Sequence, residues 1–453
     1  MPDNHQTYEF MILVGDSLIR SGASSASTTR TLLAIANAEG IHNLTVSVTL
    51  GQLTLSAPQD DNGTPFTAVH EVSPGVLDIG WRSTTEEVVA DYLLGNLTLY
   101  QAHHTLQQRV DKVAYPQWYW VAGGFAFLGA GFSFLLGADW VTMVGAAVTS
   151  LIVSTSFQHL EGMRFPGIFR FAIAGLLAVL ISTMYCSLTN SQDVAVCIVS
   201  ALAGQLAGIA AYGATQDAMM GWYLSATGRL LETLMSTAGL VSGVSVGIGI
   251  ARRFVGEDVH FIEHLSSAHT PLINLLIGAG FVTGGFSLAC GGRGIKLLSL
   301  MGLGIGAVAL HYVVSLLPIS DYSALTSISI AVGAVAVVVS KPVHLTSNAI
   351  MMLVLLPLIP GMMIYQGMLG TLYGQADALK NLGQASVQFY CLSVGGTTGQ
   401  FILSELLWLA RKRQFQRRYP EGVFDKMMIE ESNAQDVILP VFSRPFNKSR
   451  TSR

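Results

Sequence analysis

Residues 118–137 read WYWVAGGFAFLGAGFSFLLG, a run of twenty residues without a charged side chain. An α-helix needs about 20 predominantly apolar residues to cross the hydrocarbon core of a bilayer. Apolar runs of similar length follow one another from Trp118 to Trp408. The sequence therefore predicts an α-helical polytopic membrane protein.

The bulk composition supports this class. Of the 453 residues, 51% are hydrophobic and only 11% are charged, and the mean hydropathy is +0.50. A soluble domain carries roughly 25% charged residues. The net charge of −4 provides no general basic field, so nucleic acid is not an expected partner. The apolar composition makes a lipid bilayer the expected partner. The four cysteines show no metal-ligand spacing and no Walker A sequence occurs, so we expect no cofactor or metal.

The apolar runs predict about ten spanning segments in two groups of five. The first group lies at 118–137, 140–156, 168–188, 193–213 and 226–251, and the second at 271–290, 294–317, 323–340, 346–369 and 384–410. An odd number of spans in each half makes the second half enter the membrane upside down relative to the first. This arrangement is the inverted-repeat plan of many secondary transporters.

The polar segments complete the predicted domain organisation. Residues 1–115 form a small cytoplasmic α+β domain, residues 116–253 and 254–413 form the two membrane halves, and residues 414–453 form a polar cytoplasmic tail. The first part shows no signal peptide, which places the N-terminus in the cytoplasm. Lys and Arg collect in the loops that this orientation makes cytoplasmic, among them Arg109, Lys112, Arg164, Arg170, Arg293, Lys296, Lys341 and Arg411 to Arg413. Arg252, Arg253 and Lys380 are the exceptions that this orientation places outside.

Within the first part, sequence patterns predict individual elements. Helical spacing at 10–20 and 28–39 precedes an alternating pattern at 44–55 that is typical of a β-hairpin, and a third strand is expected at 66–72. A helix is predicted from Ser83 through Tyr100, because Ser83 with Glu86, or Thr84 with Glu87, matches a capping box.

Three ionisable residues, Asp217, Arg229 and Glu232, interrupt the apolar region. A charge at the bilayer centre opposes insertion by about 2.5 to 3.5 kcal/mol or more, so its usual reason for being present is function. Arg229 and Glu232 are three residues apart on a predicted helix and can pair, while Asp217 lies at the preceding break. One interpretation is a structural ion pair. The other is a site for a zwitterion, in which Arg229 binds a carboxylate and Asp217 or Glu232 binds an ammonium group.

Two further features of the second half are candidates. Pro357 and Pro360, with Gly361, fall inside an apolar segment and predict a broken helix, either a packing kink or part of a midplane site. His311 lies in mid-segment, where it could relay protons or serve as a hydrogen-bonded core histidine.

Several motifs resemble the threonine/serine exporter family. They are Ser21-Gly22-Ala23-Ser24 with Thr28-Thr29, Gln216-Asp217-Ala218-Met219-Met220-Gly221, Ser225 to Arg229 with Glu232, Gly239 to Gly249, and the element from Pro357 to Gly367. The similarity runs from about residue 10 to residue 415, in the family's order. It implies a bacterial cytoplasmic-membrane exporter of threonine and serine, driven by the proton motive force, with a soluble N-terminal domain and ten helices.

The resemblance carries Asp217, Arg229, Glu232, Pro360 and Gly361 into the expected substrate site. Asp217, Glu232 and His311 are the candidates for proton coupling. The expected partners are an amino acid, protons and lipid, and a homo-oligomer is left open. Two alternatives stand beside this function: export of dicarboxylates such as succinate, and a membrane-anchored sensor or enzyme whose active part is the N-terminal domain.

Overall fold

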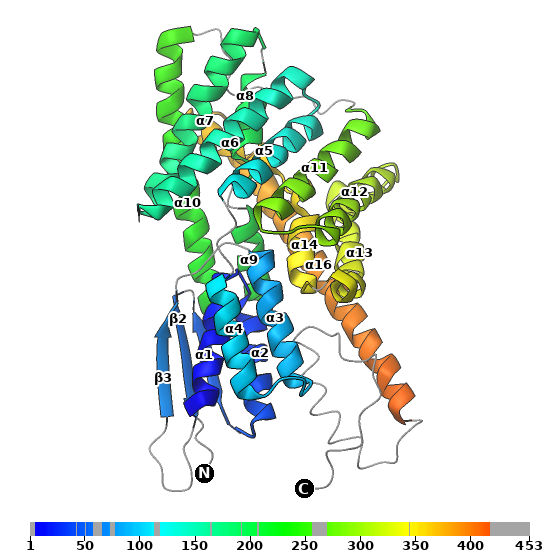
Figure 1. Cartoon of the computed structure of the whole chain (residues 1–453). Coiled ribbons are helices and arrows are strands. Elements are labelled where there is room, and N and C mark those ends of the chain that lie inside the picture. The colour runs from blue at the N-terminus through cyan, green and yellow to red at the C-terminus, as the bar shows by residue number, and fades with distance from the viewer. Residues whose placement is uncertain are drawn as a thin grey trace. The chain divides into compact units, whose positions relative to one another are not determined.

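The computed structural model describes residues 5–41, 43–49, 51–57, 66–72, 78–112, 118–163, 165–191, 193–205, 208–255, 270–343 and 345–416. These residues are mostly helical and divide into two compact units. The predicted polar tail falls almost entirely outside the described residues. Figure 1 shows the elements of both units along the chain.

The part of the first unit before residue 115, called the N-terminal unit below, combines four helices with one small sheet. The helices are α1 (His5–Arg20), α2 (Ser25–Ala38), α3 (Ile79–Leu93) and α4 (Leu99–Lys112). The strands β1 (Thr45–Thr49), β2 (Gln52–Ala57) and β3 (Phe66–Glu71) form an antiparallel sheet in the order β1-β2-β3. Thr49 pairs with Gln52 at the end of the first ladder. The α+β character, the hairpin and the third strand predicted from alternation are therefore confirmed.

A single hydrophobic core holds this unit together. It gathers fully buried side chains from the helices and from β2, including Phe10, Leu32, Leu55, Val89 and Leu106. Complete burial of one such side chain is worth about 1.5 to 3 kcal/mol. The alternation in β2 places Leu53 and Leu55 toward this core.

The start of α3 differs from the prediction. The helix begins at Ile79, because Asp78 caps it by accepting a hydrogen bond of 2.8 Å from the Trp81 backbone N–H. It also ends at Leu93, where Gly95 adopts a φ of +73°, so Tyr100 belongs to the separate helix α4. The predicted capping box from Ser83 was wrong, since a short polar side chain upstream satisfies the free N–H groups first.

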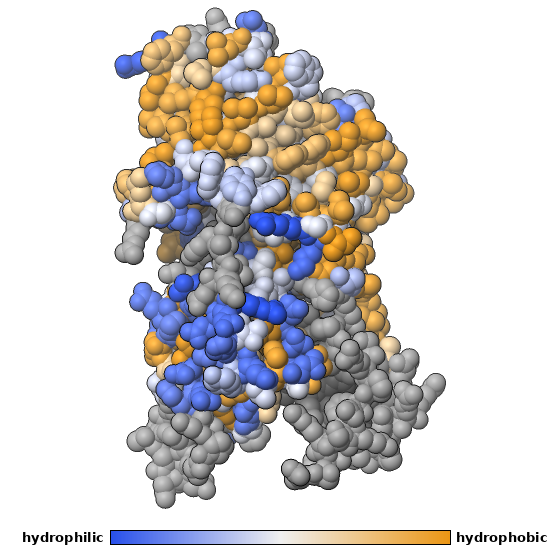
Figure 2. Space-filling model, in the orientation of Figure 1, coloured by the Kyte–Doolittle hydropathy of each residue, from blue (hydrophilic) through white to orange (hydrophobic). Residues whose placement is uncertain are grey.

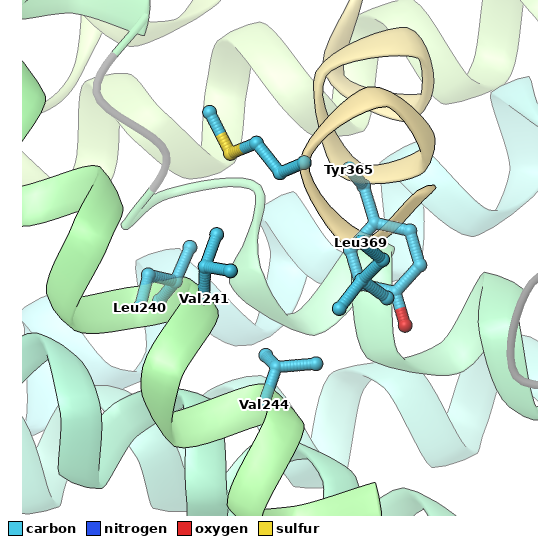
Figure 3. Close-up of a pocket in the computed structure, with 6 residues that line it drawn as sticks. Leu240, Val241, Val244, Tyr365 and Leu369 are labelled. Atoms are coloured by element: carbon cyan, nitrogen blue, oxygen red, sulfur yellow. The ribbon is translucent and has the colours of Figure 1, made fainter. Parts of the chain in front are cut away.

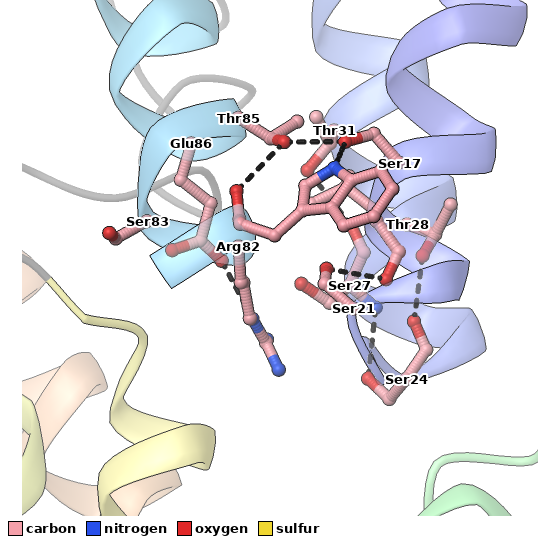
Figure 4. A network of polar contacts seen from close by, with 12 residues as sticks. Ser17, Ser21, Ser24, Ser27, Thr28, Thr31, Arg82, Ser83, Thr85 and Glu86 are labelled. Atoms are coloured by element: carbon pink, nitrogen blue, oxygen red, sulfur yellow. Dashed lines mark hydrogen bonds and ion pairs between the residues drawn. The ribbon is translucent and has the colours of Figure 1, made fainter. Parts of the chain in front are cut away.

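Polar side chains join α1 to α3, and others form hydrogen bonds within α2 (Figure 4). The Trp81 indole N–H donates to Ser17 Oγ, and Ser17 Oγ lies 2.6 Å from Thr85 Oγ1. Arg82 and Glu86, both buried, form an ion pair of 2.9 Å on α3. Ser24, from the predicted Ser-Gly-Ala-Ser motif, caps α2.

Seven helices of the described chain are long and apolar enough to cross a membrane. They are α5 (Trp118–Leu135), α6 (Trp140–Gly162), α7 (Gly167–Thr189), α10 (Tyr223–Val255), α11 (Leu272–Ala289), α12 (Ile295–Ser315) and α13 (Asp321–Val343). Large apolar side chains on these helices are exposed, and Figure 2 shows hydrophobic surface over them, whereas hydrophilic surface covers much of the N-terminal unit. Exposed apolar surface of this extent is typical of a protein that faces lipid.

Two of the predicted spanning segments are broken. The ninth segment consists of α14 (Ser347–Val354), the 3-10 turn η1 (Leu356–Leu358) and α15 (Gly361–Leu372), which confirms the break predicted at the prolines. The fourth segment was predicted as one helix, which was wrong. It is divided into α8 (Val194–Leu202) and α9 (Gly208–Met219). The last helix of the described chain is α16 (Ala378–Gln416).

The helices after residue 115 form two series with the same spacing. α5 to α10 begin at residues 118, 140, 167, 194, 208 and 223, and α11 to α16 begin at residues 272, 295, 321, 347, 361 and 378. Each start in the second series therefore follows its counterpart in the first by a nearly constant interval along the chain. Both broken segments fall at the same place in their series.

The first helices of the two series, α5 and α11, pack against each other through glycines. A Cβ on Gly124 would lie 2.6 Å from the Gly285 carbonyl oxygen, and a Cβ on Gly131 would lie 2.8 Å from that of Gly278. The contacts advance in opposite directions along the two helices, so α5 and α11 are antiparallel. Phe127 and Phe281, which occupy matching positions in the two helices, stack with ring centroids 5.6 Å apart.

The same correspondence recurs at the outer helix pairs. Gly239 of α10 lies against the Ile168 backbone of α7, with 2.5 Å from its Cβ position to the carbonyl oxygen. In the second series, Gly395 of α16 lies against the Thr326 backbone of α13, at 2.6 Å by the same measure. Small residues allow this close backbone approach within a membrane. Thus α7 pairs with α10 as α13 pairs with α16.

Candidate functional site

Asp217 and Arg229 form an ion pair between α9 and α10. Arg229 Nε lies 3.1 Å from Asp217 Oδ2, and the Ser225 hydroxyl donates to the same oxygen over 3.1 Å. Asp217 is 1% exposed, and the Arg229 side chain is 18% exposed. Two opposite charges are therefore held together away from bulk solvent.

A tight turn creates this arrangement. α9 ends in a Schellman motif, in which the Gly221 N–H donates to the Ala218 carbonyl and the Trp222 N–H donates to the Asp217 carbonyl. Gly221 has a φ of +83°, which a residue with a Cβ adopts only under strain. The chain then turns directly into α10. Ser225 and Arg229, one turn apart on α10, come to face Asp217.

The buried side of α9 carries several polar atoms without partners. Asp217 Oδ1, Gln216 Oε1 and Tyr212 Oη are buried and make no hydrogen bond in the described part of the chain. Gln216 is 5% exposed and Tyr212 is 2% exposed. Leaving one such group unsatisfied costs about 1 to 3 kcal/mol. Tyr212, Gln216 and Asp217 lie within six residues of α9, so their polar atoms are available for hydrogen bonds to a ligand or to ordered water.

Arg229 also lies next to the second helix series. A Cβ on Gly213 would lie 3.0 Å from Arg229 Nη1 and 3.6 Å from Met352 Cε of α14. The absence of a side chain at Gly213 therefore lets the Arg229 guanidinium lie directly against α9. The pair sits where α9 and α10 approach the broken segment of the other series.

The remaining predicted site residues lie elsewhere. Within the described chain, Glu232 is exposed and forms no ion pair with Arg229, so Asp217 is the acidic partner of this arginine. His311 lies on α12 with its Nδ1 buried and without a partner among the described residues. Pro360 and Gly361 begin α15 at the predicted break. The structure records no hydrogen bond or ion pair that joins these four described residues to Arg229.

Tyr212 and the broken fourth segment were not predicted as site features. Tyr212 is flanked by Ala211 and Gly213, so its sequence context contains no polar signal. Its signal is positional, because Tyr365 occupies the same position in α15 that Tyr212 occupies in α9. Tyr365 and Leu369 face Leu240 and Val244 of α10 across a small apolar pocket (Figure 3).

A helical membrane body with broken helices and buried charges is typical of membrane transport proteins. The model of the ThrE family, described as "Putative threonine/serine exporter", matches residues 9–251. The chain belongs to this family, which consists of exporters and not of enzymes.

Two curated relatives are also named as threonine/serine exporters. The chain is 25% identical over 419 residues to a "Probable threonine/serine exporter" of Mycobacterium tuberculosis, covering 88% of this chain and 76% of that protein. It is also 25% identical over 429 residues to the "Threonine/serine exporter" of Corynebacterium glutamicum, covering 91% and 84%. No solved structure matches the chain.

Proposed function

We propose that this protein exports L-threonine and L-serine across the bacterial cytoplasmic membrane in exchange for protons. The observation that carries the proposal is the buried Asp217–Arg229 pair, whose carboxylate keeps one oxygen without a partner among the described residues. Family membership supports the substrate class. A purely structural ion pair would not explain the unpartnered groups on the same side of α9.

The proposed binding mode uses both charges. Arg229 presents a planar fork that suits a carboxylate, and Asp217 accepts hydrogen bonds from the ammonium group. Glu232 is assigned to the rim of the site, since it is exposed one turn along α10 from Arg229. Pro360 and Gly361 start the broken helix of the other half and are proposed to line the opposite wall.

Proton coupling is proposed to act through Asp217. The amino acid is released on the outside, and Asp217 then takes up a proton from that side. The protonated protein without substrate returns to the inward-facing state and releases the proton to the cytoplasm. Glu232 is a second candidate that its exposure makes weaker, because it is not enclosed together with Arg229 and Asp217. His311, with its buried Nδ1, is the candidate relay residue.

The proposed architecture is ten spans arranged as two inverted halves, 116–253 and 254–413, behind a cytoplasmic domain of residues 1–115. The nearly constant interval between matching helix starts supports this division. The antiparallel packing of α5 against α11 is what a two-fold axis in the membrane plane would produce. Both termini are proposed to be cytoplasmic, and the tail 414–453 to belong to neither half.

Conservative and disruptive changes at Arg229 test the site. Arg229→Lys keeps the charge beside Asp217 but loses the fork, and Arg229→Gln removes both. We expect Arg229→Gln to abolish threonine counterflow in proteoliposomes and Arg229→Lys to weaken it about tenfold or more, since hydrogen bonds to charged groups contribute roughly 1.5 to 3 kcal/mol.

Arg170→Gln is the matched control. Arg170 Nη1 forms an ion pair of 2.8 Å with Glu161 at the junction of α6 and α7, away from the unpartnered groups of α9. We expect this variant to transport normally. Normal counterflow by reconstituted Arg229→Gln would remove the site assignment.

The same vesicles separate the amino-acid function from dicarboxylate export. A dicarboxylate needs two cationic contacts, and among the described residues Arg229 is the cation that the ion pair places in the site. We expect labelled threonine and serine to exchange and succinate not to do so. Exchange of succinate alone would transfer the proposal to the dicarboxylate class.

A further inference from the structure

The two halves use a matching tyrosine in different ways. Tyr212 lies on α9 and Tyr365 at the same position of α15, the helix that corresponds to α9 in the second series. Each tyrosine reaches across to the last long helix of the other series. Tyr365 packs against Leu240 and Val244 of α10, and Tyr212 packs beside Gly396 of α16.

The surroundings of the two hydroxyl groups differ. Tyr365 makes an interaction of its own and faces an apolar pocket. Tyr212 Oη, in contrast, has no hydrogen-bond partner among the described residues. A Cβ on Gly396 would lie 2.4 Å from the Met351 sulfur and 3.2 Å from Tyr212 Oη, so the absence of a side chain at Gly396 lets Tyr212 and Met351 approach α16 closely.

A second unpartnered hydroxyl lies on the same helix of the other half. Ser393 precedes Gly396 by three residues on α16, so the two residues share a face. Its Oγ is completely buried and has no partner in the described part of the chain. Since Gly396 contacts Tyr212, the hydroxyls of Tyr212 and Ser393 are brought to the same region between α9 and α16.

These two hydroxyls are suited to the side-chain hydroxyl of threonine or serine, which Arg229 and Asp217 do not bind. The charged pair recognises the carboxylate and ammonium groups that all amino acids share. Buried hydroxyls without partners are suited to a substrate hydroxyl, because each can donate one hydrogen bond and accept another. A site built this way strongly rejects an analogue that lacks the hydroxyl, because its own groups then stay unpaired.

We propose that Tyr212, assisted by Ser393, binds the side-chain hydroxyl of the exported amino acid and so determines the preference for hydroxy amino acids. This inference rests on the proposed function. The contact between α9 and α16 would then select hydroxy amino acids over other amino acids, which the ion pair alone does not distinguish.

The test compares threonine with 2-aminobutyrate, which has the same carbon chain without the hydroxyl. Half-saturation concentrations are measured by counterflow in proteoliposomes for the unmodified protein, Tyr212→Phe, Ser393→Ala and the control Tyr365→Phe. We expect Tyr212→Phe to weaken the threonine preference about tenfold, which corresponds to about 1.4 kcal/mol. The half-saturation concentration of 2-aminobutyrate should stay unchanged, because the lost hydrogen bond is made only to the substrate hydroxyl. Tyr365→Phe should keep the preference.

A stability measurement distinguishes this role from a structural one. Tyr212→Phe removes a buried hydroxyl that lacks a partner among the described residues, so we expect the melting temperature of the purified variant to stay equal or rise. An unchanged threonine preference in both Tyr212→Phe and Ser393→Ala, or an equal loss in Tyr212→Phe and Tyr365→Phe, would overturn the inference. Absence of threonine counterflow in the unmodified protein would instead overturn the proposed function, and this inference with it.

Discussion

At the scale of single residues, the identity of the acidic partner decides how the site works. Spacing along α10 favoured Glu232, because residues three apart share a helix face. The turn at Gly221 brings Asp217 back to Arg229 instead, at 3.1 Å. A contact made through a turn depends on backbone geometry that side-chain spacing cannot reveal. The sequence therefore predicted the members of the cluster but not which of them pair.

Replacing Asp217 with Asn separates binding from coupling. The amide keeps the shape of the side chain but takes up no proton at physiological pH. We expect threonine counterflow to persist with a half-saturation concentration raised about tenfold, because a charge-assisted hydrogen bond to the ammonium group becomes a neutral one. Threonine transport driven by an imposed pH gradient should be lost. Both activities are measured in the same proteoliposomes.

Glu232→Gln is the companion variant. Because Glu232 is exposed and Arg229 pairs with Asp217, we expect transport driven by the pH gradient to survive this change. If Glu232→Gln lost the coupling and Asp217→Asn kept it, the proton would have to be assigned to Glu232.

At the scale of helices, two breaks of the same kind had unequal signals in the sequence. Pro357 and Pro360 remove backbone donors, so the break before α15 was predictable. The division between Leu202 and Gly208 contains no proline, and its apolar residues resemble a continuous span. Glycine costs only about 1 kcal/mol in a helix interior, which makes it a weak signal. The break before α15 lies at the matching position of the second series, and it indicates the break between α8 and α9 more strongly than the glycine does.

The packing of α5 against α11 gives a prediction with an adjacent control. A Cβ on Gly124 would lie 2.5 Å from the Ala289 backbone nitrogen, whereas a Cβ on Gly123 would meet nothing within 4 Å. We expect Gly124→Ala to destabilise the protein by about 1 to 3 kcal/mol, since the two backbones must separate. Gly123→Ala should be neutral or slightly stabilising.

Thermal melting of the two variants in the same detergent measures this difference. Equal melting temperatures for Gly123→Ala and Gly124→Ala would show that α5 and α11 do not pack closely. Both glycines are visible in the sequence, and small residues are common where membrane helices pack. The sequence does not identify which glycine of an adjacent pair makes the contact, because that depends on the rotation of each helix about its own axis.

At the scale of the whole molecule, the proposed inverted repeat places matching residues on opposite sides of the membrane. Met163 follows α6 and Leu317 follows α12, the corresponding helix of the second series, and each of these two residues is 55% exposed. In a background without the native cysteines, we expect a membrane-impermeant maleimide to label Leu317→Cys in intact cells and Met163→Cys in inverted vesicles. Labelling of both positions from one side would exclude the inverted arrangement.

The count of apolar runs predicted two groups of five, but hydropathy could not establish how the groups match. The correspondence became visible only when helix boundaries, including both breaks, were compared. Sequence similarity between the halves is thin, since lipid-facing positions tolerate many apolar residues and retain few identities.

The stacked rings of Phe127 and Phe281 mark the place where the proposed axis passes, because a residue can touch its own counterpart only beside that axis. If one half rocks against the other during transport, displacement grows with distance from this line. The two rings would then stay in contact while the two halves turn about them. Access could alternate across the membrane without parting the centre of the protein.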